Sequence, residues 1–116
     1  MKTFKDIIAW QKAYQLTLKI YKETTDFPKS EEFGLKSQLR RACVSIISNI
    51  AEGFKKISTK EKIHFYKIAE CSLEEVKCQT MLCVDLGYFN KDQYKKIELL
   101  ENESGKTLNG WINTQR

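Results

Sequence analysis

The chain has 116 residues, a formal net charge of +5, and only one proline and five glycines. This length fits one domain with a substantial core, and the scarcity of turn residues argues against a many-stranded β fold, which needs a turn signal about every 8–12 residues. No apolar run approaches the ~18 residues of a membrane span and the N-terminus has no secretion signal, so we expect a cytoplasmic protein with no membrane contact.

Apolar side chains cover more than half of the circumference of the first predicted helix, residues 3–25. One arc, at steps of three and four residues, consists of Phe4, Ile7, Trp10, Tyr14, Leu18 and Tyr21, and a second arc beside it consists of Ala9, Ala13, Leu16 and Ile20. A helix that lines the core of a monomeric bundle needs an apolar stripe of about 100°. The surplus predicts burial on two sides, by the helix's own bundle and by another subunit. The residues we assign to the subunit interface are Trp10, Ala13, Leu16 and Ile20.

Three more helices are predicted, over residues 32–54, 59–86 and 91–112. Pro28 separates the first two helices, because proline disfavours α geometry in the residue before it. Gly53 suits the end of the second helix, and Ser58 with Glu61 matches a capping box that opens the third. Asn90 offers a weaker cap for the fourth helix. Four helices with short links predict a single all-α domain, an antiparallel up-down four-helix bundle.

A polar stripe runs along the second predicted helix between two apolar flanks. Its members, at spacings of three and four residues, are Gln38, Arg41, Ser45, Ser48, Asn49 and Glu52. Polar groups in such a position are expected to be partly buried, and buried polar groups need partners. We interpret the stripe as a structural network that fixes bundle register or subunit pairing, in which the loss of Arg41 or Glu52 is strongly destabilising. The alternative, a catalytic cluster, lacks an activating histidine or second acid near Ser45 or Ser48.

The cysteines and the single histidine do not match a metal site. Cys43, Cys71, Cys78 and Cys83 contain no C-x-x-C pair, so we interpret them as reduced core or boundary residues. His64, Cys71 and Cys78 follow one another at seven-residue steps along the third predicted helix, and each step is about 10.5 Å along the axis. Adjacent ligands of one metal cannot be that far apart. We therefore predict no metal, no cofactor and no catalytic residue.

Lysines gather in two places that lack balancing acids nearby in the sequence. One group lies on the polar side of the first predicted helix and consists of Lys5, Lys12, Lys19 and Lys22, and the other consists of Lys55, Lys56, Lys60 and Lys62. One interpretation is ordinary solvated surface, because lysine is common on exposed helix faces. The functional interpretation is a phosphate-binding surface that recurs in every subunit of an oligomer. No zinc finger, aromatic RNA-binding motif or glycine-rich phosphate loop indicates sequence-specific recognition.

Several short segments resemble a known family. They are Phe4, Trp10-Gln11 and Ala13, then Phe27-Pro28, Gly34-Leu35 and the run from Gln38 to Ala42, then the run from Ser45 to Gly53, and finally Ile68-Ala69, the run from Ser72 to Glu75, and Leu86-Gly87-Tyr88. Over nearly its whole length the chain is similar to the four-helix bundle proteins encoded in intervening sequences of bacterial 23S ribosomal RNA genes. The same fold family includes the accessory variability determinant of diversity-generating retroelements. Ser48 to Gly53 is the most specific element, Ile47 departs from a frequent proline, and the likeness is loose over residues 91–116.

The resemblance implies a ring-like homopentamer of bundles without enzymatic activity and, for the retroelement branch, binding to a reverse transcriptase and to nucleic acid. Together with the lysines it favours a non-enzymatic oligomeric scaffold that contacts structured RNA or a nucleic-acid enzyme. The alternative is a module that docks a polypeptide partner such as a reverse transcriptase and makes no nucleic-acid contact. An RNA-cleaving helical toxin is disfavoured. Toxins of that kind have an Arg and a His five residues apart on one helix. In this chain the residue five positions after Arg41 is Ile46, and the residue five positions before His64 is Thr59.

Overall fold

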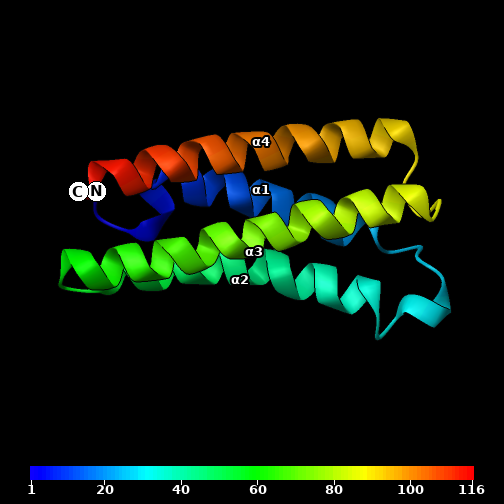
Figure 1. Ribbon diagram of the computed structural model, residues 1–116, viewed down its shortest axis with the longest axis horizontal. Helices are drawn as coiled ribbons and strands as arrows, with labels where there is room; N and C mark the ends of the chain where they lie inside the picture. Colours follow the sequence, from blue (N-terminus) through cyan, green and yellow to red (C-terminus); the bar gives the residue numbers. More distant parts are fainter.

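A computed structural model describes residues 1–116 as a bundle of α-helices joined by short links (Figure 1). The helices are α1 (Ile8–Glu23), α2 (Leu35–Lys55), α3 (Thr59–Asp85) and α4 (Lys91–Thr114), and two 3-10 turns, η1 (Phe4–Asp6) and η2 (Lys29–Glu31), precede α1 and α2. Each helix runs opposite to the one before it, so the α2–α3 turn lies at the same end of the bundle as η1. The predicted all-α fold with four helices and no strand is confirmed.

The core is one continuous apolar cluster between the four helices. α2 packs most extensively on α3, and α1 packs most extensively on α4. Core side chains recur at helical spacing, among them Ala13, Leu16 and Ile20 of α1, Leu39, Cys43 and Ile46 of α2, Ala69, Leu73 and Val76 of α3, and Ile97, Leu108 and Ile112 of α4. Burial of one large apolar side chain stabilises a fold by about 1.5–3 kcal/mol. This packing holds α4 in place although two glycines weaken it as an isolated helix. None of the helices combines the length and the apolar character that crossing a bilayer requires.

The first helix begins later than the sequence predicts, because the chain makes a 3-10 turn before it. The Asp6 carboxylate accepts hydrogen bonds from the backbone N–H groups of Lys2 and Thr3, at 2.9 and 3.0 Å. These bonds close η1 into a turn of its own. Ile7 then adopts an extended conformation, and α1 starts at the next residue instead of at residue 3.

The other helix starts depend on side-chain caps. α2 begins at Leu35 rather than at residue 32; its N-cap residue, Gly34, has no side chain to cap the helix, and the Glu31 carboxylate accepts the Leu35 N–H at 3.0 Å. The cap predicted for α3 is confirmed, since Ser58 Oγ accepts from the N–H of Glu61 at 3.1 Å. The Asn90 cap of α4 is also confirmed, and it is a complete capping box.

Gly53 lies in the last turn of α2, which ends at Lys55. The residue is buried against α3. A Cβ atom at this position would lie 2.6 Å from Cε1 of Tyr66 and 3.1 Å from Cβ of Phe65. Gly53 therefore lies near the end of α2, as expected, and the structure adds its role, which is to let the Tyr66 ring approach the α2 backbone.

Candidate nucleic-acid interface

The end of the bundle where η1 meets the α2–α3 turn (Figure 1) is formed by segments rich in lysine. We call this region the basic end, and its members are Lys2, Lys5, Lys55, Lys56, Lys60 and Lys62. Two of the three acids beside them form hydrogen bonds at helix starts and not with lysines. Asp6 accepts backbone N–H groups, and Glu61 accepts a hydrogen bond from Ser58 at 3.1 Å. The third acid, Glu52, forms no ion pair. The basic end therefore has an excess of positive charge.

Two of these lysines are held in fixed positions by contacts that involve no carboxylate. Lys62 donates a hydrogen bond to the carbonyl of Phe54 at 2.7 Å, and its ammonium lies 5.5 Å from the centre of the Phe54 ring. The Lys56 ammonium lies 4.9 Å from the centre of the Phe65 ring. Carbonyl oxygens and ring faces attract a cation without neutralising it. Both charges thus remain available to an anion.

The predicted lysine group on α1 does not form a continuous basic surface. Lys12 forms an ion pair with Glu103 of α4 at 3.3 Å, and Lys19 forms one with Glu23 at 3.1 Å. Lys22 is exposed but lies in the last turn of α1, and that end of α1 is at the opposite end of the bundle from the basic end. The expectation that this group lacks balancing acids is wrong, because folding brings α4 against α1 and because Glu23 follows Lys19 by one helical turn.

The middle of the polar stripe lies half-buried at the contact between α2 and α3. The hydroxyls of Ser45 and Ser72 share a hydrogen bond of 2.8 Å across the two helices. Asn49 donates to the Ser45 carbonyl at 2.8 Å and to its hydroxyl at 3.1 Å. Ser48, also half-buried, takes no part in these hydrogen bonds. The predicted structural network exists, but it is limited to this short cross-helix link.

The charged members of the stripe lie on the surface. Gln38, Arg41 and Glu52 are exposed, and no ion pair includes Arg41 or Glu52. The interpretation of Arg41 and Glu52 as partly buried partners is therefore wrong. The stripe follows the edge of the α2–α3 contact, and at an edge the long side chains reach water while only the short ones are covered.

Three of the residues assigned to the subunit interface belong to the core of the single chain. Ala13, Leu16 and Ile20 have no exposed surface, because α2 and α4 cover this side of α1. They have no surface to offer to another subunit, so their assignment is corrected. Trp10 is the one assigned residue that remains partly exposed.

The uncovered apolar surface of α1 is its other arc, and it continues onto α2. We call it the α1–α2 face, and its members are Trp10, Tyr14, Leu18 and Tyr21 of α1 with Val44 and Ile47 of α2. Leu18 is 55% exposed and Tyr14 is 41% exposed. The Trp10 and Tyr14 rings stack at 4.8 Å, and the Arg40 guanidinium lies 4.5 Å from the centre of the Tyr21 ring and joins the two helices. An aromatic surface with a fixed arginine at its border is typical of a protein–protein contact.

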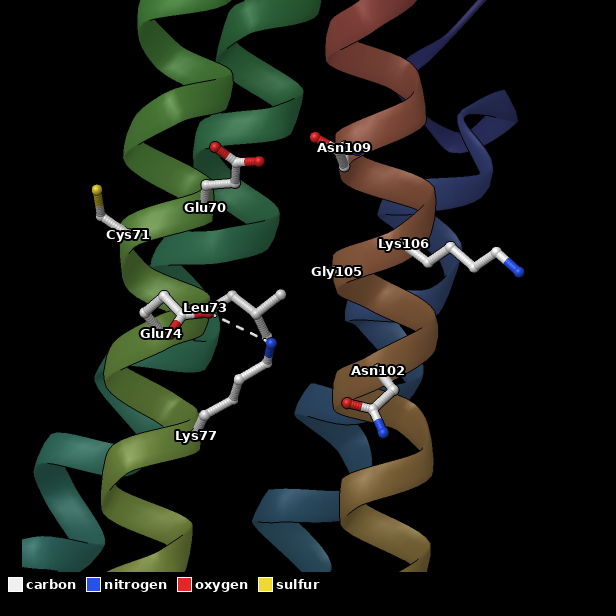
Figure 2. Close-up of a pocket in the computed structure, with 9 residues that line it drawn as sticks. All are labelled: Glu70, Cys71, Leu73, Glu74, Lys77, Asn102, Gly105, Lys106 and Asn109. Carbon is white, nitrogen blue, oxygen red and sulfur yellow. Dashed lines mark hydrogen bonds and ion pairs between the residues drawn. The ribbon is translucent and has the colours of Figure 1, made fainter.

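A surface hollow of about 440 Å³ lies between α3 and α4 (Figure 2). Its carboxylates are already paired, since Glu74 forms an ion pair with Lys77 at 3.3 Å and Glu70 forms one with Lys67 at 3.3 Å. The Cys71 thiol points away from the hollow in Figure 2. Among the residues that line the hollow, no nucleophile and base meet at hydrogen-bonding distance.

The core contains one carboxyl group, Glu101 of α4, which is 2% exposed. It accepts a hydrogen bond from the Thr80 hydroxyl at 2.7 Å. Burial raises the pKa of Glu101 to about 7, although the Thr80 hydrogen bond and the charge of Lys77 act in the opposite direction. Sequence reasoning missed this residue. Its position four residues after Ile97 and seven before Leu108 places it on the core face of α4, and that spacing was the available signal.

The thiols are not arranged for chemistry. Cys43 and Cys83 are buried, and burial raises the pKa of the Cys43 thiol to about 12 and that of Cys83 to about 11. A protonated thiol is a weak nucleophile and a poor metal ligand. Cys71 and Cys78 are exposed and free. Nowhere do three His, Cys, Asp or Glu side chains converge as a metal site requires.

Comparison with known proteins finds one matching family and a similar solved structure. Residues 5–110 match the family model described as 23S rRNA-intervening sequence protein. A similar solved structure is a protein of unknown function from the S23 ribosomal protein family of Bacteroides thetaiotaomicron. It is 25% identical, with a TM-score of 0.80, and the match covers 90% of this chain and 98% of that chain. No curated protein sequence matches the chain.

Proposed function

The chain belongs to the family of 23S rRNA-intervening sequence proteins, and on that premise we propose that it is a non-enzymatic, oligomeric bundle that contacts structured RNA through its basic end. The observation that carries this proposal is the uncompensated lysine charge where η1 meets the α2–α3 turn. Lysines that neutralise phosphates release counterions, and this release supplies most of the non-specific affinity for nucleic acid. No element of the fold reads base edges in a groove, so most of the contact is expected to be independent of sequence.

We propose that the subunits associate through the α1–α2 face, with the homopentamer that the family resemblance implies as the expected assembly. In a closed ring each subunit presents its own basic end, so weak lysine contacts act together on one RNA. Exposure of such an apolar surface to water is also unfavourable, and surfaces of this kind usually mark a contact with another molecule. A second copy of the chain is the simplest cover.

The assembly is tested by light scattering coupled to size exclusion. The expected mass of the parent protein is about five times 13.6 kDa. Leu18→Glu places a charge in the α1–α2 face and should lower the mass, because an unpaired charge is costly in a subunit contact. Leu99→Glu is the matched control, since Leu99 is 61% exposed on α4 and lies outside the face. A monomeric parent protein at micromolar concentration contradicts the proposed assembly.

The RNA contact is tested by titrating a labelled, structured RNA at two or three salt concentrations. The double variant Lys55→Glu and Lys60→Glu reverses two exposed charges of the basic end, and it should lower the affinity and flatten the dependence on salt. The variant is expected to fold, because Lys55 is the last residue of α2 and Lys60 lies in the first turn of α3. An acidic residue is unfavourable at the end of a helix and favourable in its first turn, so the two changes offset one another.

A matched control separates position from total charge. Lys22→Glu with Lys29→Glu makes the same change in net charge at the opposite end of the bundle, where both lysines are exposed and unpaired. This variant should retain most of the affinity. If both variants lose affinity equally, net charge and not the basic end governs binding. If the parent protein binds no RNA at ~50 mM salt, the proposal fails.

A second candidate function, the docking of a polypeptide such as a reverse transcriptase, is favoured by one feature. Phe33 is 94% exposed between η2 and α2. It lines two neighbouring surface hollows, and the unpaired Arg41 lines both of them too. Exposed aromatic and arginine side chains supply much of the energy of protein contacts. A reverse transcriptase is the partner to test, and Phe33→Ala should weaken its binding while leaving RNA binding unchanged.

A further inference from the structure

η1 and the last turns of α2 line an open surface hollow of about 430 Å³ at the basic end. Two aromatic residues, Phe4 and Phe54, line it together with the charged residues Lys2, Lys55 and Glu52. The volume lies within the ~300–1,000 Å³ range of sites that hold small organic ligands. Two cations on the rim of an aromatic hollow match a ligand that is flat, apolar on its faces and attached to phosphates.

The two aromatic walls are fixed before any ligand arrives. The Phe4 ring packs edge-on against the Trp10 ring at 5.0 Å. Phe54 is half-buried against the core, and the Lys62 ammonium lies 5.5 Å from the centre of its ring. Side chains held in this way lose little conformational freedom on binding. Fixed aromatic side chains are the common platform on which proteins stack unpaired nucleobases.

Glu52 is the only carboxylate among the residues that line the hollow. It is exposed and has lysines nearby, yet it forms no ion pair within the chain. A carboxylate only accepts hydrogen bonds. Guanine is the one common base whose Watson–Crick edge has two adjacent N–H donors, at N1 and N2. Adenine and cytosine have a ring nitrogen acceptor beside their amino group, and uracil has a single N–H donor between two carbonyls. Each of these bases would therefore place an acceptor atom against a carboxylate oxygen, and the two would repel each other.

We propose that this hollow holds one unpaired guanine nucleotide of a structured RNA. The base lies against Phe4 and Phe54, its N1–H and N2–H groups donate to the Glu52 carboxylate, and the flanking phosphates lie beside Lys2 and Lys55. This inference rests on the proposed RNA-binding function and adds to it a single position at which the base matters. It also gives Glu52 a role that the bundle itself does not supply.

The experiment uses RNA hairpins that differ only in one bulged nucleotide, which is guanine, adenine, uracil or an abasic site. The parent protein should bind the guanine hairpin at least about five-fold more tightly than the abasic hairpin, as expected for one stacked base. Glu52→Gln should reduce the preference for guanine over adenine. It should leave the affinity for the abasic hairpin unchanged or higher, because it removes a negative charge that repels phosphates.

Controls distinguish a base contact from an electrostatic effect. Glu98→Gln makes the same charge change at an exposed, unpaired position on α4 and should leave the guanine preference intact. Phe54→Leu keeps an apolar wall but removes the stacking surface, so it should lower the affinity for all hairpins with a bulged base. Size exclusion and circular dichroism check that each variant is folded.

The outcomes separate this inference from the proposed function. Equal affinity for the guanine and abasic hairpins overturns the guanine site while the RNA-binding function stands. An unchanged preference in Glu52→Gln also overturns it. If Glu52→Gln or Phe54→Leu changes the mass of the assembly, the hollow belongs to a contact between subunits and the inference is wrong. If the parent protein binds none of the hairpins at ~50 mM salt, both proposals fail.

Discussion

Replacing the buried Glu101 by glutamine should stabilise the protein at alkaline pH and have little effect at acidic pH. The buried position of Glu101 suits a neutral acid. Thr80 Oγ1 lies 2.7 Å from Glu101 Oε2 and 3.1 Å from the carbonyl oxygen of Lys77. A hydroxyl has one hydrogen and cannot donate to both. Thr80 donates to the Glu101 carboxyl oxygen, and this bond favours the ionised form, but burial outweighs it and favours the neutral acid. The side chain of glutamine is neutral at every pH, and its oxygen can still accept the Thr80 hydrogen bond.

The magnitude follows from the displaced pKa. Burial raises the pKa of Glu101 from 4.5 to about 7, and each unit corresponds to about 1.4 kcal/mol. Because the folded state holds the proton more tightly than the unfolded state, ionisation destabilises the fold as the pH rises. The cost is nearly absent below pH ~4.5, grows between pH ~4.5 and ~7, and reaches about 3 kcal/mol at pH ~8. Lys77, Glu74 and Glu98, which also influence this carboxyl group, remain in the variant.

The assay compares urea denaturation of the parent protein and Glu101→Gln at several pH values between 4.5 and 8. The buried amide has a desolvation cost of its own, but that cost does not change with pH. The informative quantity is therefore how the difference in the free energy of unfolding between the two proteins varies with pH. The variant should gain about 3 kcal/mol on the parent across this range, or roughly 10 °C in melting temperature. A difference that stays constant with pH would show that Glu101 is ionised in the fold and that the argument is wrong.

Two further predictions concern single positions. Gly53→Ala should destabilise the fold by about 1–3 kcal/mol through the clash with the buried Tyr66 ring, whereas Gly110→Ala, which meets open space, should stabilise α4 by up to ~1 kcal/mol. Thermal melts of the two variants should therefore move in opposite directions, and a stabilised Gly53→Ala is the contrary result. Arg41→Ala and Glu52→Ala should each change the free energy of unfolding by less than about 0.5 kcal/mol, because both side chains are exposed and unpaired. A loss of several kcal/mol in urea denaturation would restore the buried-partner interpretation of these residues.

The helices could be predicted from the sequence because their signals are local. Apolar spacing and the Ser58 and Asn90 caps depend on residues within one or two turns of each other, and these predictions are confirmed. The start of α1 could not be found in this way, because the Asp6 turn and a continuing helix use the same apolar spacing. The role of Gly53 was also hidden, since the pattern within α2 does not show that Tyr66 of α3 packs on it.

The surface could be predicted only in part, because it depends on how the helices face one another. One apolar arc of α1 stays exposed in the single chain, but spacing alone did not show which arc the bundle covers, and Leu16 proved to be core. The ion pair between Lys12 and Glu103 joins helices from opposite ends of the sequence. Phe4 and Phe54 meet around one hollow only because η1 folds back on the end of α2.

The pairing of the helices also determines the order in which the bundle should fold. Only residues 56–58 separate α2 from α3, and this neighbouring pair has the most extensive contact in the molecule. The α1–α4 contact, in contrast, must close a loop that spans most of the chain, which costs more conformational entropy. Contacts between neighbours in sequence form early and speed folding. The α2–α3 hairpin is therefore the natural folding nucleus. A substitution within it, such as Gly53→Ala, should mainly slow folding, whereas a change on the late-docking α4, such as Glu101→Gln, should act mainly on the unfolding rate.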